Sequence, residues 1–356
     1  MKPVLIIAEA GVNHNGSLKT ALELVDIAVD AGADIVKFQY FNPKTLVAPN
    51  ARKADYQIEN TKKGAEENQF SMLEKLCLSF DEHSQVAEYC AKMGIEYLCT
   101  PFCEADLDII RPLITKIKIP SGELTNHPFL EYSAKAQLPI ILSTGMATTQ
   151  EIIESIEVIY STCLKEEAPF PQLDILQCNT AYPTPFEDVN LAVIPMLRQT
   201  LRSIYPELYI NIGYSDHTLG IEVPIAAVAL GSTIIEKHFT IHRDSDGPDH
   251  RASLEPLELK AMVTSIRNIE QAIGSGIKRP QTSEKVNIAI ARKSWHYSND
   301  LTQGSILKKQ DLVLLRPGHG FKPSQLKELI GQSLSANISQ YDIVELNNFI
   351  RENHEN

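Results

Sequence analysis

Residues that bind anions, metals or protons follow short apolar segments at intervals along this chain of 356 residues. Such side chains can form one site, because in a barrel of parallel strands the residues at the carboxyl ends of the strands meet at one face. We therefore expect a shared site from Glu9, Lys37 with Gln39, Thr100, Lys118 with Ser121 and Glu123, Ser143, Thr180, Ser215 with His217, and Glu236 with His238.

Two lysines, Lys37 and Lys118, lie within apolar segments that are typical of buried strands. A buried ammonium group without a counter-anion costs several kcal/mol, so such a pair favours a negatively charged ligand. The hydroxyls of Thr100, Ser121 and Ser143 would add donors beside the lysines. The set predicts a site for a small polyanion such as a phosphorylated acid. The alternative is that each lysine only pairs with a carboxylate of the core.

Two histidines end consecutive apolar segments, His217 in YSDHTLG and His238 in IIEKHFT. Neighbouring strands lie about 5 Å apart, so both imidazoles can reach one ion if they point inward. With carboxylates at Asp216 and Glu236, the pair predicts a divalent metal site rather than hydrogen-bonded filler. If oxygen ligands complete the coordination of the ion, Mn²⁺ is favoured and Mg²⁺ is the second choice. Zn²⁺ is a further alternative.

Two glutamates are candidates for proton transfer. Glu9 follows a strand interior and Glu123 follows a Pro-Ser-Gly turn, where burial can raise the pKa of a carboxyl group. Ion pairing with the nearby lysines is an equally open role for each of them. His14 in GVNHNG is open between loop architecture and substrate contact.

The order of the segments predicts a (β/α)8 TIM barrel. Continuous apolar segments suit parallel strands that are buried on both faces, and helical stretches separate them. An open doubly wound sheet is the weaker alternative, since no G-x-G-x-x-G turn follows an early strand. The expected strands are Val4–Ala8, Ile35–Phe38, Ile95–Cys99, Ile114–Ile119, Pro139–Leu142, Leu173–Gln177, Tyr209–Gly213 and Thr233–Ile235.

Local signals divide the chain further. Ser17 is a plausible N-cap for the first helix, and Gly32 can end it. The polar segment 42–71 is long for a strand-to-helix connection, so it is either a substrate lid or a plain surface excursion. We expect a catalytic domain over residues 1–275, a linker over 276–288 and a small mixed domain over 289–356.

Composition excludes several classes of partner. The formal net charge of −12, without a Lys/Arg-rich block, argues against a nucleic-acid surface. No stretch approaches the roughly 20 apolar residues that a membrane helix needs, so no membrane association is expected. The six cysteines are scattered and form no C-x-x-C pair, which suits a reducing compartment. The chain is expected to be cytoplasmic.

Sequence blocks along nearly the whole chain resemble the sialic acid synthase family of bacteria. The blocks, in order, are IIAEAGVNHNG, VKFQYF, KADYQ, CTPF, KIPSGELTN, ILSTGMA, CNTAYPTPFEDVNL, GYSDHTLG, IIEKHFT and GPDHRASLEP. The tail, with VLLRPGHGFKPSQL and ELIGQS, looks like the antifreeze-like (SAF) domain that follows the barrel in that family.

The resemblance implies condensation of phosphoenolpyruvate with N-acetylmannosamine, giving N-acetylneuraminate and phosphate. It implies that phosphoenolpyruvate is held by Lys37, Thr100, Lys118, Ser121 and Ser143. The implied metal ligands are His217 and His238, and the implied catalytic residues are Glu9, Gln39, Glu123 and Glu236. The implied sugar-binding residues are Tyr182, Ser215, Asp249 and Arg316, with Arg316 reaching the barrel of a partner in a domain-swapped homodimer.

Departures from the family pattern leave the sugar open. Gln177-Cys178-Asn179 stands where many relatives have HCT or HCN, and Ala181 replaces Glu, Asn or Ile. One alternative is N,N'-diacetyllegionaminate synthase, acting on 2,4-diacetamido-2,4,6-trideoxymannose. Another is a metal-dependent barrel aldolase or isomerase that does not use phosphoenolpyruvate, which the two lysines argue against. A third is a non-catalytic binding role based on the tail, which the polar residues at the strand ends argue against.

Overall fold

The computed structural model describes residues 3–350, and the chain divides after Gly274 into two compact units. Each unit has its own apolar core. Over residues 3–350, none of the helices combines the length and the apolar character that a membrane crossing requires.

The first unit is built on a parallel sheet of eight strands in the order β3-β2-β1-β8-β7-β6-β5-β4. Strand β1 pairs with both β2 and β8, and β3 lies beside β4, so the sheet curls into a nearly closed barrel. This confirms the TIM barrel over the open sheet. The strands are β1 (Leu5–Gly11), β2 (Ile35–Tyr40), β3 (Glu96–Pro101), β4 (Ile117–Ile119), β5 (Ile140–Ser143), β6 (Leu173–Cys178), β7 (Ile210–Asp216) and β8 (Ile234–His238).

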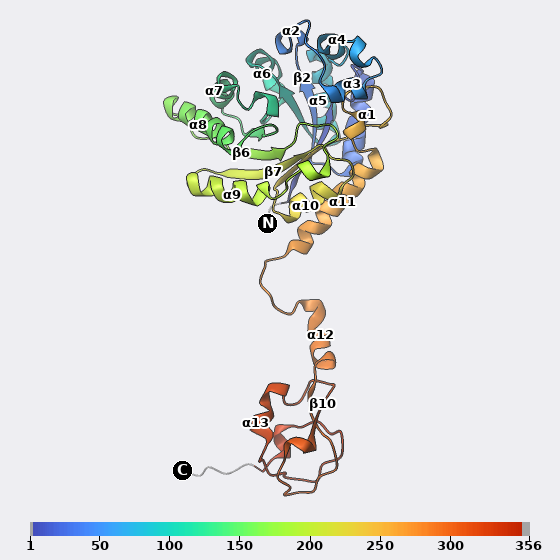
Figure 1. Cartoon of the computed structure of the whole chain (residues 1–356), viewed down its shortest axis with the longest axis vertical. Helices are drawn as coiled ribbons and strands as arrows, with labels where there is room; N and C mark the ends of the chain where they lie inside the picture. The colour runs from blue at the N-terminus through green and yellow to red at the C-terminus, as the bar shows by residue number, and fades with distance from the viewer. Residues whose placement is uncertain (1–2, 351–356) are drawn as a thin grey trace. The chain divides into compact units, whose positions relative to one another are not determined.

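A helix follows each strand and packs outside the barrel (Figure 1). The first begins after Ser17, whose side chain accepts from the backbone N–H of Thr20, and ends at Gly32 in the left-handed conformation, as predicted. The helices are α1 (Leu18–Ala31), α5 (Phe80–Met93), α6 (Glu104–Ile110), α7 (His127–Lys135), α8 (Thr149–Lys165), α9 (Val193–Ile204), α10 (Glu222–Ala229) and α11 (Pro256–Ile273).

The barrel interior is layered, with an apolar layer below a polar one. Side chains two residues apart on a strand point to the same face, so an inward apolar residue fixes the next inward position. The apolar layer consists of Ile7, Ile35, Leu98, Ile141, Leu176 and Ile234. Two residues beyond each of these, in the same order, stand Glu9, Lys37, Thr100, Ser143, Cys178 and Glu236.

Several strand ends differ from those expected. Strands β7 and β8 continue to Asp216 and His238, past their apolar stretches, and stay paired through Ser215 with Glu236 and Asp216 with Lys237. Strand β4 begins only at Ile117, because the 3-10 turn Arg111–Leu113 and residues 114–116 lie outside it.

The polar segment after β2 is structured. It contains α2 (Pro43–Leu46), α3 (Asp55–Asn60), a 3-10 turn (Gly64–Glu66) and α4 (Gln69–Glu74). Lys53 is buried and bonds to Glu67 at 3.0 Å, which braces the segment internally. The Asn60 amide donates to the Pro248 carbonyl at 2.7 Å and ties the segment to a loop after β8.

The second unit has a small core and little regular structure. Strands β9 (Ser294–Tyr297) and β10 (Leu312–Leu315) pair antiparallel, and α13 (Leu326–Leu329) is a single turn. Its likeness to an antifreeze domain stays a prediction. Helix α12 (Thr282–Ala291), which buries none of its side chains, overlaps the segment 276–288 that we expected to be a linker. The linker assignment also stays a prediction.

A Cβ atom at Gly213 on β7 would lie 2.4 Å from Cδ2 of Leu176 and 2.8 Å from the carbonyl oxygen of Ile234. We predict that Gly213→Ala lowers the free energy of unfolding by about 1–3 kcal/mol, because neighbouring strands would have to move apart. Denaturant unfolding measures this loss. Gly122→Ala is the control, since its Cβ meets nothing within 4 Å. Equal stabilities of the two variants would contradict the close packing of β6, β7 and β8.

Candidate active site

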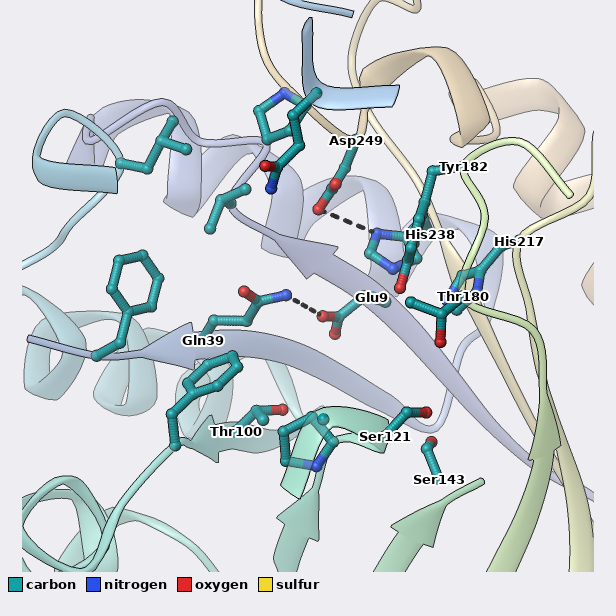
Figure 2. Close-up of a pocket in the computed structure, with 18 of the residues that line it drawn as sticks. Glu9, Gln39, Thr100, Ser121, Ser143, Thr180, Tyr182, His217, His238 and Asp249 are labelled. Carbon is teal, nitrogen blue, oxygen red and sulfur yellow. Dashed lines mark hydrogen bonds and ion pairs between the residues drawn. The ribbon is translucent and has the colours of Figure 1, made fainter. Parts of the chain in front are cut away.

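A cavity of about 280 Å³ opens at the carboxyl ends of the barrel strands. Figure 2 shows Glu9 between the hydroxyls of Thr100, Ser121 and Ser143 on one side and the histidines on the other. Almost all of the residues predicted from the sequence line it: Glu9, Lys37, Gln39, Thr100, Lys118, Ser121, Ser143, Thr180, Tyr182, Ser215, His217, Glu236, His238 and Asp249.

A network of buried charges forms the floor of the cavity. The Lys37 ammonium lies 2.8 Å from Glu9 Oε2 and 3.5 Å from Glu236 Oε2. The Lys118 ammonium lies 3.6 Å from the other oxygen of Glu236, Oε1. All four side chains are at most 4% exposed. Glu236 therefore joins the two lysines and neutralises part of their charge.

Hydroxyl groups complete this floor. Lys37 donates to Thr100 Oγ1 at 3.1 Å, and Lys118 donates to Ser143 Oγ at 2.8 Å. Ser121 Oγ lines the same cavity and accepts from the backbone N–H of Gly145 at 2.9 Å. Two ammonium groups and several hydroxyls thus face one small volume, which is a donor set suited to phosphate and carboxylate oxygens.

Burial and the nearby lysines give the two glutamates, Glu9 and Glu236, different pKa values. Burial, the largest influence, raises the pKa of Glu9 from its ordinary 4.5 to about 7, although Lys37 opposes the shift. Burial also acts to raise the pKa of Glu236, but Lys118 and Lys37 outweigh it and lower that pKa to about 2. Glu236 is therefore a permanent anion, whereas Glu9 can gain or lose a proton near neutral pH.

The two histidines stand side by side across from the lysines. Their ring centroids are 5.2 Å apart, and the ring of Tyr182 lies 4.1 Å from that of His217. Nδ1 of His217 bonds to the Asn179 carbonyl at 2.5 Å, which fixes that ring and leaves Nε2 available to a ligand. Nδ1 of His238 lies 3.8 Å from Asp249 Oδ2 (Figure 2).

These rings fit part of a divalent metal site. Nδ1 of His238 is buried with no hydrogen-bond partner among residues 3–350, and burial lowers the pKa of His238 well below its usual value. A neutral imidazole with a free lone pair is the form that binds metal ions. Within the same residues, no three or more His, Cys, Asp or Glu side chains come together as a metal-ligand group. A metal here would need substrate or water oxygens to complete its coordination.

Three residues fall outside the cavity. Glu123, predicted to be catalytic, is not among its lining residues, because its carboxylate turns to accept from the Asn126 side chain at 2.7 Å, beside the start of α7. Arg316 belongs to the second unit, and its contact with sugar stays a prediction. His14 also lies outside, and its Nδ1 accepts from the backbone of Gly16, which favours loop architecture.

Sequence reasoning missed two features of the cavity. Cys178 lines it, with Sγ 3.7 Å from Ser121 Oγ, and counting two residues on from the apolar Leu176 of β6 would have found it. The segment 42–76 supplies an apolar side of the cavity from Leu46, Val47, Met72 and Leu73. Its overall polarity hid these side chains, although the spacing of Met72, Leu73 and Leu76 is helical.

An ion pair behind the site positions both histidines. Lys237 and Asp216 alternate with the inward residues of β8 and β7 and are opposite each other in the strand register. Their side chains are fully buried, and Lys237 Nζ lies 2.6 Å from Asp216 Oδ2. Asp216 also accepts from the Tyr214 hydroxyl and from the backbone N–H of Thr218. The pair joins the two strands next to His217 and His238.

We predict that Lys237→Met lowers the free energy of unfolding by about 3–5 kcal/mol, because it leaves the Asp216 carboxylate buried without its partner. The double variant Asp216→Asn with Lys237→Met is the matched control and should recover part of the loss, since it removes both charges. Denaturant unfolding of the three proteins measures this. A single variant as stable as the wild type would contradict the positioning role.

The raised pKa of Glu9 makes stability depend on pH. The folded protein keeps this proton up to about pH 7, whereas the unfolded chain releases it near 4.5, so Glu9 progressively disfavours folding as the pH rises between these values. Glu9→Gln removes the effect. We predict that its stability relative to the wild type grows by about 3 kcal/mol between pH 4.5 and 7. Chelator-treated proteins unfolded in denaturant at several pH values test this, and a difference independent of pH would refute it.

Comparison with known proteins places the chain in a family. Residues 24–278 match the NeuB family. The N,N'-diacetyllegionaminic acid synthase of Campylobacter jejuni is 43% identical over 97% of this chain and 99% of its own length. The protein of the same name from Legionella pneumophila is 43% identical over 94% of this chain and 91% of its own.

A solved structure agrees with these matches. The N-acetylneuraminic acid synthetase of Leptospira borgpetersenii is similar with a TM-score of 0.67 and 35% identity, over 81% of this chain and 90% of that one. The family model covers β2 to β8, and the two relatives cover nearly the whole chain. This chain belongs to the NeuB family.

Proposed function

We propose that this protein condenses phosphoenolpyruvate with 2,4-diacetamido-2,4,6-trideoxymannose, forming N,N'-diacetyllegionaminate and inorganic phosphate. Near full-length identity of 43% to two proteins named N,N'-diacetyllegionaminic acid synthase supports this sugar over N-acetylmannosamine, which the sequence blocks had put first. The observation that carries the condensation is the cavity itself, in which two buried lysines and several hydroxyls share one volume with a pair of histidines.

Phosphoenolpyruvate fits the floor of the cavity. Its phosphate and carboxylate would take the donors of Lys37, Lys118 and the hydroxyls of Thr100, Ser121 and Ser143. Glu236 neutralises part of the lysine charge while the site is empty, so the network tolerates burial without ligand. The same donors argue against a barrel aldolase or isomerase that uses no phosphorylated acid.

The proposed reaction forms one carbon–carbon bond and breaks one carbon–oxygen bond. C3 of phosphoenolpyruvate attacks the aldehyde carbon of the sugar, whose oxygen takes up a proton, and positive charge develops at C2. Water adds to C2 and loses its protons. The bond between C2 and the oxygen of the phosphate group then breaks, which releases phosphate and leaves a 2-keto acid. The protein's task is to hold the two carbons in contact and to move protons.

Of the glutamates, Glu9 is the one suited to proton transfer. Its pKa of about 7 lets it accept a proton from the attacking water and return it within one turnover. Gln39 donates to Glu9 Oε1 at 3.1 Å and orients the carboxyl group. Glu236, with a pKa of about 2, would stay ionised and stabilise the positive charge at C2.

His217 and His238 would hold a divalent ion, Mn²⁺ or Mg²⁺, which would polarise the aldehyde carbonyl by Lewis-acid catalysis. The ring of Tyr182 lies beside that of His217, tilted by 35°, and would cover the same end of the sugar. Ser215 donates to Glu236 Oε1 at 2.9 Å and is a candidate contact to the sugar through its hydroxyl oxygen. Asp249, whose pKa burial raises to about 6, is the remaining candidate.

The proposal includes a domain-swapped homodimer in which Arg316 of the partner subunit reaches an acetamido group of the sugar. This part rests on the resemblance of the tail sequence alone. It predicts that the isolated barrel binds phosphoenolpyruvate but binds the sugar weakly.

The test is phosphate release from phosphoenolpyruvate by the full chain with Mn²⁺, comparing the diacetamido sugar with N-acetylmannosamine. We expect release with both substrates present, a higher kcat/KM for the diacetamido sugar, and loss of activity in chelator that Mn²⁺ restores. Folded, metal-loaded protein that releases no phosphate with either sugar would refute the condensation. A preference for N-acetylmannosamine would refute the sugar assignment and leave the condensation standing.

A further inference from the structure

One side of the cavity is apolar, and neither the phosphoenolpyruvate floor nor the histidine pair uses it. It comes from the segment after β2 and from the end of β3. We call it the apolar wall and define it as Phe41, Leu46, Val47, Met72, Leu73 and Phe102.

Some side chains of the apolar wall are buried and packed together, and the others are partly exposed to the cavity. Phe41 and Met72 are 6% and 4% exposed and belong to a small cluster of their own, separate from the barrel core. The rings of Phe41 and Phe102 meet edge to face with centroids 5.8 Å apart. Leu46, Val47, Leu73 and Phe102 are half-buried, so their side chains can still cover a ligand. The wall is a preformed surface rather than a loose loop.

Two amide side chains that line the cavity beside the wall are paired with each other. Gln57 Oε1 accepts from the backbone N–H of Ala54 at 3.0 Å and from Gln69 Nε2 at 3.5 Å. A hydroxyl group pressed against the wall would lose its water without a partner, which costs about 1–3 kcal/mol in proteins. A methyl group in the same place gains free energy from burial.

In the proposed reaction, the aldehyde carbonyl would lie near His217 and His238 and above the buried lysines. The apolar wall lines the same cavity, so the remaining carbons of the sugar would extend to it. The two candidate sugars differ in the remaining carbons. N-acetylmannosamine carries hydroxyls at C4 and C6, whereas the diacetamido sugar carries an acetamido group at C4 and a methyl group at C6.

We propose that the apolar wall determines sugar specificity, by taking the C6 methyl group and the methyl of the C4 acetamido group and by rejecting hydroxyls at these positions. This inference rests on the proposed condensation. It assigns Val47 and Leu73 as specificity-determining residues, since both are half-buried and line the cavity. Neither is part of the floor or of the histidine pair.

The experiment changes the polarity of the wall while keeping its shape. Val47→Thr and Leu73→Asn are nearly isosteric, and Leu257→Asn, at a leucine that is 83% exposed and outside the cavity, is the matched control. We compare kcat/KM for the diacetamido sugar, for N-acetylmannosamine and for its 6-deoxy analogue, in the full chain with Mn²⁺. The 6-deoxy analogue isolates the contribution of the C6 methyl group.

Each wall variant should lower the ratio of kcat/KM for the diacetamido sugar to that for N-acetylmannosamine by about 10- to 100-fold. This is the range by which one methyl group changes specificity in an apolar pocket. KM for phosphoenolpyruvate and the thermal midpoint should stay close to those of Leu257→Asn. An unchanged preference, or an equal loss with both sugars, would overturn the assignment, because the wall would then only shape the fold.

A binding measurement separates this inference from the proposed function. Ligand-observed NMR measures how the diacetamido sugar binds to the Mn²⁺-loaded protein. Binding that the wall variants weaken, without phosphate release by the wild type, would overturn the condensation and keep the wall. Phosphate release with unchanged sugar preference in the variants would overturn the wall and keep the condensation.

Discussion

The sharing of Glu236 between Lys37 and Lys118 is the interaction on which the rest of the site depends. Its two carboxylate oxygens lie 3.5 and 3.6 Å from the two ammonium groups, and all three side chains are at most 4% exposed. Without this carboxylate, Lys37 would keep only Glu9 as a partner and Lys118 would lose the carboxylate beside it, and an unpaired buried cation costs several kcal/mol. With it, the cavity keeps a positive floor that an anionic substrate can neutralise further. Burial and charge thus give an acidic protein one place that is suited to a polyanion.

The barrel supplies the precision that such a network needs. A layer of apolar residues lies directly beneath, and each network member stands two residues further along its strand, so the pleat fixes its direction. Behind the cavity, the Lys237–Asp216 pair locks β7 to β8 beside both histidines. The segment after β2, which is braced by the Lys53–Glu67 ion pair, adds an apolar side to the cavity. The charged groups, the histidines and the apolar surface therefore come from different parts of the chain but are held by one barrel.

The sequence was most informative where a residue type contradicted its surroundings. Lys37 and Lys118 were recognisable because charged side chains interrupt apolar strands, and the strand pleat then placed them correctly. Glu123 was expected at the cavity but does not line it, because a turn after a strand leaves the direction of its side chains undetermined by spacing. The apolar wall was missed, since its residues come from a polar segment and gather only through packing. Asp216 was considered as a ligand, yet the alternation on β7 points it outward to Lys237.

The affinity of the chelator-treated protein for phosphoenolpyruvate, measured by titration calorimetry in the wild type and in Lys118→Met, tests the charged floor most directly. Lys118 contacts Glu236 and Ser143 in the empty cavity and would meet the substrate anion once it binds. The account predicts affinity that is roughly thirtyfold weaker or more in the variant, with the fold retained by circular dichroism. Equal affinity in the two proteins would contradict it.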